Sequence, residues 1–186
     1  MILGTNIKGE ANMGLINKIY IVIIALLVCS CDSQQIKDPP DMVIEYGYGL
    51  DTPGFDTTIE YIKPGARSWA YSTITGIVHM IADSSHPLES WYPYPKIEKT
   101  NKVKINISYS PDYYTVIYWP EKYIGNADTK EFDFQTIDVI DNIIIMPNEE
   151  SGYVFRVRAV WESVNGIKGT QGYADYVFFV SNNLME

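Results

Sequence analysis

Cysteine is almost absent from this chain, which has two among 186 residues, Cys29 and Cys31. A single residue separates them, so a disulfide between them is disfavoured, and the chain has no second pair to complete a zinc site. Histidine is equally scarce, with only His79 and His86. The sequence also lacks the HExxH, CxxC and GxSxG motifs and a glycine-rich phosphate loop. These absences favour a protein that is not an enzyme and uses no cofactor.

Positive charge is also in short supply. The chain has 14 Lys and Arg against 23 Asp and Glu, a formal net charge of -9, and no local basic cluster. Such a chain repels phosphate backbones, so nucleic acid is not expected as a partner. Anionic lipid headgroups are disfavoured for the same reason. Any attachment to a membrane must therefore use something other than surface charge.

No hydrophobic run is long enough to span a bilayer. The longest, Ile19 to Val28, has ten apolar residues, whereas a transmembrane helix needs about 20. Its length fits the apolar region of a signal peptide, with Lys18 just before it. We therefore interpret residues 1–30 as a cleaved signal peptide. Met13 is an alternative true start.

The run ends in V-C-S-C, Val28 to Cys31. This segment resembles the lipobox of bacterial lipoproteins, with an aliphatic residue, a small residue and then the cysteine that receives the lipid. The resemblance implies that Cys31 becomes the acylated first residue. Acyl chains would hold the protein at a membrane, because several buried chains together give stable anchoring.

Residues 31–41 contain the lipidated cysteine and a polar stretch with a Pro-Pro pair, which we interpret as a tether. The expected location is extracytoplasmic, at a bacterial membrane. The sequence leaves open whether this is an inner, an outer or a single membrane.

Helical periodicity is missing beyond residue 42, whereas alternating apolar residues and β-branched or aromatic runs are frequent. We predict that residues 42–186 form one all-β domain, an antiparallel immunoglobulin-like β-sandwich of about 8–10 strands. Six segments carry the clearest strand patterns: 56–62, 102–108, 113–119, 142–147, 152–161 and 172–180. The last two are expected to form a hairpin in which Asp175 pairs with Arg156 or Arg158 on the exposed face.

The stretch IIIMPNEESGYVFRVRAVW, which ends at Trp161, resembles the corner between strands E and F of fibronectin type III and other immunoglobulin-like sandwiches. The resemblance implies that Tyr153 is the corner tyrosine, whose hydroxyl bonds to backbone a few residues upstream. Small lipoproteins of unknown function with an immunoglobulin-like domain have a similar layout. The resemblance supports a fold class and no activity.

One segment gathers reactive side chains. His79 to Ser90 holds both histidines, Asp83, Ser84 and Ser85. A metal site of His79, Asp83 and His86, or a Ser-His-Asp set, is the functional interpretation. The alternative, which we favour, places His79 on the outward face of a strand and Asp83 and His86 in a turn.

A second segment, WYPYP from Trp91 to Pro95, interleaves aromatic rings with prolines. Rigid exposed rings suit sugars or a protein partner, so Trp91, Tyr92 and Tyr94 are candidate ligand contacts. They could instead pack as a plug under the sandwich. The sequence thus predicts a lipid-anchored, non-enzymatic binding or accessory protein with a protein or glycan partner. A carbohydrate-binding module is the first alternative, and a hydrolase is less favoured.

Overall fold

The computed structural model describes residues 36–52, 55–73, 75–90, 92–98, 100–126, 134–147, 152–162 and 170–181. The predicted signal peptide, Cys31 and Trp91 lie outside these residues, so their assignments stay predictions. The compact unit that contains every described residue starts at Ile36. No helix in the described ranges has the length and apolar character needed to cross a membrane.

The first of two sheets has the strand order β2-β1-β6-β10-β9. Its strands are β1 (Met42–Tyr46), β2 (Thr58–Ile62), β6 (Lys102–Ile107), β9 (Val139–Ile140) and β10 (Ile143–Ile145). All four pairings are antiparallel. Buried and less buried residues alternate along β1 and β6, because successive side chains of a strand point to opposite faces.

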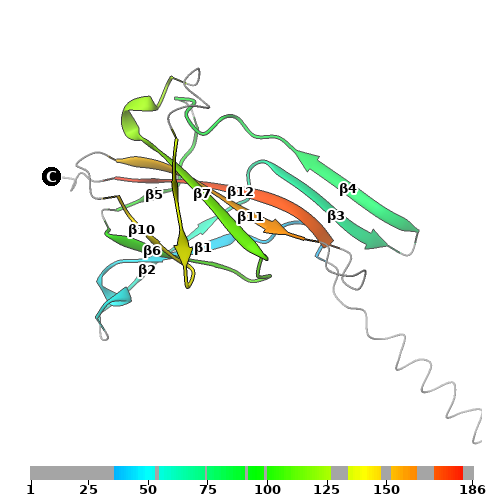
Figure 1. Cartoon of the computed structure of the whole chain (residues 1–186), viewed down its shortest axis with the longest axis horizontal. Helices are drawn as coiled ribbons and strands as arrows, with labels where there is room; N and C mark the ends of the chain where they lie inside the picture. Colours follow the sequence, from blue (N-terminus) through cyan, green and yellow to red (C-terminus); the bar gives the residue numbers. More distant parts are fainter. Residues whose placement is uncertain are drawn as a thin grey trace, which may run out of the picture. The chain divides into compact units, whose positions relative to one another are not determined.

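The second sheet has the order β4-β3-β12-β11-β7-β8, and β5 pairs with β12 in parallel. Its strands are β3 (Arg67–Thr73), β4 (Gly76–Ala82), β5 (Lys96–Ile97), β7 (Tyr113–Pro120), β8 (Gln135–Ile137), β11 (Tyr153–Trp161) and β12 (Thr170–Val180). Two 3-10 turns, η1 (Tyr48–Leu50) and η2 (Glu121–Tyr123), complete the described elements. β11 and β12 form the predicted hairpin (Figure 1).

The connectivity is that of an immunoglobulin-like sandwich. β1-β6-β10-β9 follow the order A-B-E-D, and β12-β11-β7-β8 follow the order G-F-C-C′. β2, β3 and β4 are additions between the first strand and β5. β2 widens the first sheet beyond β1, whereas the β3–β4 hairpin widens the second sheet beyond β12 (Figure 1).

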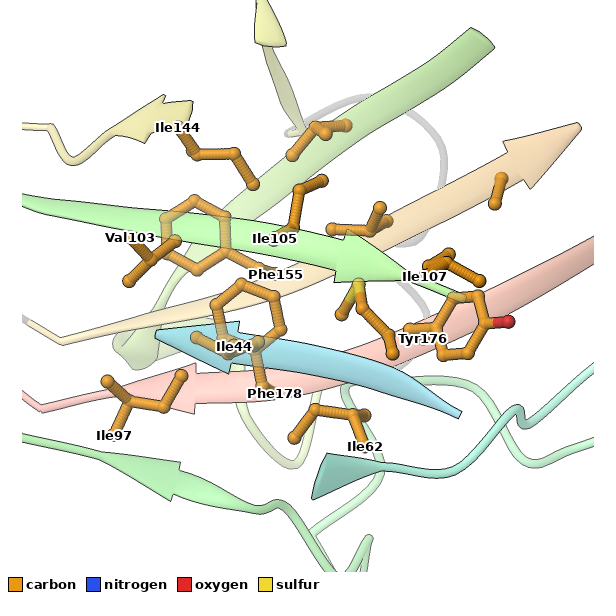
Figure 2. Packing of buried hydrophobic residues seen from close by; sticks show 14 of the residues in the cluster. Ile44, Ile62, Ile97, Val103, Ile105, Ile107, Ile144, Phe155, Tyr176 and Phe178 are labelled. Atoms are coloured by element: carbon orange, nitrogen blue, oxygen red, sulfur yellow. The ribbon is translucent and has the colours of Figure 1, made fainter. Parts of the chain in front are cut away.

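The main core lies between the two sheets. Ile44, Ile105 and Ile144 of the first sheet face Phe155 and Phe178 of the second (Figure 2). The rings of Phe155 and Phe178 stack with centroids 5.1 Å apart. Because both sheets bury an unbroken row of apolar side chains here, this contact fixes how they pack.

The first described residues pack against the sandwich. Pro39 is buried, the indole N–H of Trp69 donates to the Ile36 carbonyl at 3.0 Å, and the Tyr176 hydroxyl donates to the Pro40 carbonyl at 2.6 Å. Residues 36–41, predicted as part of the tether, are therefore attached to the domain. The part of the predicted tether that precedes the compact unit is residues 31–35.

The all-β sandwich prediction is confirmed, and each of the six predicted segments contains a strand. Twelve strands occur in the described residues, more than the expected 8–10. The additional strands include β5, β8 and β9, which have only two or three residues. Such strands are too short to show an alternating pattern in the sequence. Asp175 pairs with Arg158 as expected, but it is buried and not on an exposed face.

Candidate functional site

A groove of about 540 Å³ lies on the outer face of the second sheet, at the end where β11 finishes and β12 begins. Strands β3, β4, β7, β11 and β12 all contribute to it. Its lining residues are Ser68, Ala70, His79, Tyr113, Arg158, Val160, Trp161, Glu162, Gln171, Gly172 and Tyr173. We call this surface the groove.

The register of the strands arranges the lining in rows. Val160 of β11 pairs with Tyr113 on one side and with Tyr173 on the other. The next strand continues this row with Ser68, which pairs with Tyr173. Neighbouring strands are about 4.8 Å apart, so the backbones of Tyr113 and Tyr173 are separated by roughly 10 Å. The two rings thus flank a small apolar strip.

Arg158 is fixed inside the groove. Its Nε and Nη2 atoms donate to the two carboxylate oxygens of Asp175 at 2.7 and 2.8 Å, and its guanidinium lies 4.3 Å from the ring centroid of Tyr173. The hydrogen bond with Asp175 is the main cause that raises the pKa of Arg158. A fork-shaped ion pair of this kind holds a side chain in one geometry. Arg158 therefore presents its remaining N–H groups to the groove from a fixed position.

Asp175 is only 4% exposed. Two loops surround it: Gly65 donates its N–H to the Asp175 carbonyl at 2.8 Å, and the Asp175 N–H donates to the Ala66 carbonyl at 2.8 Å. Ser84 accepts the Ala66 N–H at 3.1 Å, which links the loop after β4 to the same place. These backbone bonds hold the loops over Asp175, and Arg158 supplies the charged partner that its buried carboxylate needs. Asp175 therefore positions Arg158.

The added hairpin forms one wall of the groove. It approaches β12 at Gly172, whose φ is +146° and whose missing Cβ would lie 1.9 Å from the Ser68 carbonyl oxygen. Only glycine fits this close backbone contact and this φ. The approach brings Ser68, Ala70 and His79 alongside the tyrosine row.

The two histidines lie at opposite ends of the outer face. His79 lines the groove. It pairs with Ala70 of β3, which in turn pairs with Gln171 of β12. His86 packs edge-to-face on Trp119, with ring centroids 5.6 Å apart, and Trp119 is level with Phe179. Gln171 and Phe179 are eight residues apart on β12, roughly 27 Å at strand rise. The structure therefore does not bring His79 and His86 together.

His86 begins a turn. His86 accepts the Leu88 N–H on Nδ1 at 3.1 Å, and its carbonyl accepts the Glu89 N–H at 3.0 Å. Asp83 is exposed. Within the described residues, no group of three or more His, Cys, Asp or Glu side chains is placed to hold a metal ion.

Tyr92 and Tyr94 are half-buried and cover a second hydrophobic cluster, at the other end of the same outer face. We call it the outer cluster, and its buried members are Leu88, Ile117, Trp119, Val154, Val177 and Phe179. The Tyr94 hydroxyl donates to the Pro87 carbonyl, and burial raises the pKa of Tyr94 to about 12. This bond and the packing on the outer cluster hold the Tyr94 ring against the sheet. Ligand contact by Trp91, Tyr92 and Tyr94 stays a prediction.

Tyr153 opens β11, as the corner assignment predicts, and is buried. Its ring packs edge-to-face on Tyr118, with centroids 5.5 Å apart. The predicted bond from its hydroxyl to upstream backbone stays a prediction.

The groove is not evident from the amino-acid sequence. Arg158 and Tyr173 sit on the outward faces of predicted strands, and Gln171 precedes the predicted segment 172–180. This pattern alone resembles an ordinary solvated face. The missing information was the widening of the sheet by β3 and β4, which turns that face into a groove.

The fold and the groove define an immunoglobulin-like sandwich with an open, aromatic-lined surface on its widened sheet. No protein-family model, curated protein or solved structure matches this chain.

Proposed function

We propose that this protein is a lipid-anchored, extracytoplasmic binding module that acts through the groove and catalyses no reaction. The observation that carries the proposal is the groove, where an ion pair with a buried carboxylate orients Arg158 beside two tyrosines. Fixed polar groups next to aromatic rings are typical of ligand-binding sites.

The anchor rests on the V-C-S-C motif. Four residues, Asp32 to Gln35, separate Cys31 from the compact unit at Ile36. The five steps of chain from Cys31 to Ile36 span at most roughly 18 Å. A lipid on Cys31 would therefore keep the domain close to the bilayer surface.

The groove favours a neutral carbohydrate as its ligand. Tyr113 is 47% exposed and offers a ring face, on which an apolar face of a sugar can stack. Arg158, Gln171 and Glu162 supply planar hydrogen-bonding groups nearby. Because Asp175 neutralises Arg158, the groove has no strong preference for an anion.

The proposal is tested with the full-length chain in detergent on a broad glycan array. We expect binding to at least one neutral glycan, and loss of that binding when Tyr113→Ala and Tyr173→Ala are combined. Tyr61→Ala, on the opposite sheet and 67% exposed, is the matched control and should bind as the wild type does. Binding that survives the double variant would exclude the groove as the site.

A further inference from the structure

We propose that β4 is a homodimerisation edge, through which two copies of the chain join their widened sheets into one. The strand ends the second sheet, and no described residue pairs with its outer side. Natural proteins protect such edges with charge, proline or short length, because an open edge recruits another strand. β4 has none of these protections: it is seven residues long, GIVHMIA, without a formal charge or a proline.

The other edges contrast with it. β8 and β9 have three and two residues. β2 contains Glu60 and is followed closely by Pro64. Within the described part of the chain, β4 is thus the edge left unprotected.

The hydrogen-bonding direction of β4 follows from the strands beside it. The Asp175 N–H donates to the Ala66 carbonyl, and backbone groups alternate in direction along a strand. The backbone N–H and C=O groups of residues 68, 70 and 72 of β3 therefore point towards the side of β12. The backbone groups of residues 67, 69 and 71 point towards β4. Trp69 pairs with Met80. Hence Val78 and Met80 bond to β3, and the N–H and C=O groups of Ile77, His79 and Ile81 point to the open edge.

These three residues are self-complementary. An antiparallel pair of β4 strands, with a two-fold axis at His79, places Ile77 opposite Ile81 of the second copy and His79 opposite its counterpart. Each of the three is then a hydrogen-bonded pair, so every outward backbone group finds a partner. Ile77 and Ile81 are 67% and 76% exposed, and the pairing would bring these β-branched side chains together on one face.

Charge favours a second copy as the occupant. The chain has a net charge of -9, so most surfaces of two copies repel each other. β4 contains no residue with a formal charge, so pairing two copies of β4 brings no like charges together. Opposed residues of an antiparallel pair lie on the same face, so both grooves would open on one side of the joined sheet. The dimer would thus present two ligand sites side by side.

The test measures the mass of the full-length chain in detergent by sedimentation. Cys29→Ser and Cys31→Ser are introduced, so that neither acylation nor a disulfide can associate copies. We expect a dimer for this parent, and a monomer when Ile77→Lys and Ile81→Lys are added. Because both isoleucines are exposed, the fold should be retained, as circular dichroism will show. The matched control, Ile59→Lys with Ile145→Lys on the opposite sheet, should remain dimeric.

Mixing two oppositely charged variants should restore the dimer if the β4 strands pair as proposed. A chain with Ile77→Asp and Ile81→Asp should also be monomeric, and equal amounts of the Lys and Asp chains should form a heterodimer. A parent that is monomeric at every concentration, or a dimer that survives the two lysines, would overturn the proposal. An edge that binds only an added partner peptide would overturn it as well. None of these outcomes depends on whether the groove binds a glycan.

Discussion

Asp175 is the residue on which the geometry of the groove depends most. Its carboxylate is buried and accepts two hydrogen bonds from Arg158. Asp175→Asn keeps the size of the side chain but removes the charge, so Arg158 loses its partner. We expect the free energy of unfolding to fall by about 1–3 kcal/mol, as measured by urea denaturation. Asp138→Asn, the same change at an exposed position, should shift it by less than about 0.5 kcal/mol. Equal effects of the two changes would contradict the role of the ion pair.

Tyr94 is expected to make stability depend on alkaline pH. Burial raises its pKa from 10.0 to about 12, so the folded protein retains this proton where the unfolded chain loses it. The stabilisation is present below pH 10 and is lost as the pH rises from about 10 through about 12. Urea denaturation at pH 8 and pH 11 should show a smaller alkaline loss for Tyr94→Phe than for the wild type. An identical loss in both proteins would show that Tyr94 ionises as freely when folded as when unfolded.

At the scale of elements, the attachment of the β3–β4 hairpin can be isolated with a pair of glycines. Gly172 and Gly76 both have positive φ, +146° and +139°, but only Gly172 has a neighbour that a Cβ would strike. Gly172→Ala and Gly76→Ala therefore share backbone strain and differ in the clash with Ser68. We expect Gly172→Ala to cost about 1–3 kcal/mol more in the free energy of unfolding. If the two variants are equally stable, β3 does not depend on this close approach.

The segment after β4 is held to the sheet by Leu88, which is fully buried in the outer cluster. Leu88→Ala should leave a cavity and lower the free energy of unfolding by about 2–5 kcal/mol. Ile145→Ala, at an exposed position, should change it by less than about 0.5 kcal/mol. A small effect of Leu88→Ala would mean that Leu88 does not hold the segment after β4 against the sheet.

Elements with long alternating patterns could be predicted from the sequence, and those defined by their neighbours could not. Tyr153 to Trp161 shows a clear two-residue period and is β11. β5 has two residues and exists only because it pairs with β12. Likewise, Asp175 was predicted to pair with an arginine, but its burial depends on the loops at Gly65 and Ser84, which lie about a hundred residues away in the chain. The periodicity of a strand's own sequence does not show which distant loops will bury its residues.

At the scale of the whole molecule, the predicted lipid anchor can be tested independently of the β-sandwich domain. Metabolic labelling with a palmitate analogue should label the wild type and not Cys31→Ser, because we propose that V-C-S-C is a lipobox whose last cysteine carries the lipid. Cys29→Ser is the control and should still be labelled. Label that persists in Cys31→Ser would contradict the anchor, whereas the groove and the β4 edge would be unaffected.

The central claim is that the widened face of an immunoglobulin-like sandwich binds a ligand through Tyr113, Tyr173 and Arg158. Its most direct test is binding of the full-length chain to the glycan array with Arg158→Met, which removes the charged fork and keeps much of the apolar stem. Circular dichroism must first show that the variant is folded. We predict that the folded variant loses most of the glycan binding seen for the wild type, while Tyr61→Ala retains it. Wild-type protein that binds no glycan, or a folded Arg158→Met that binds as well as the wild type, would contradict the account.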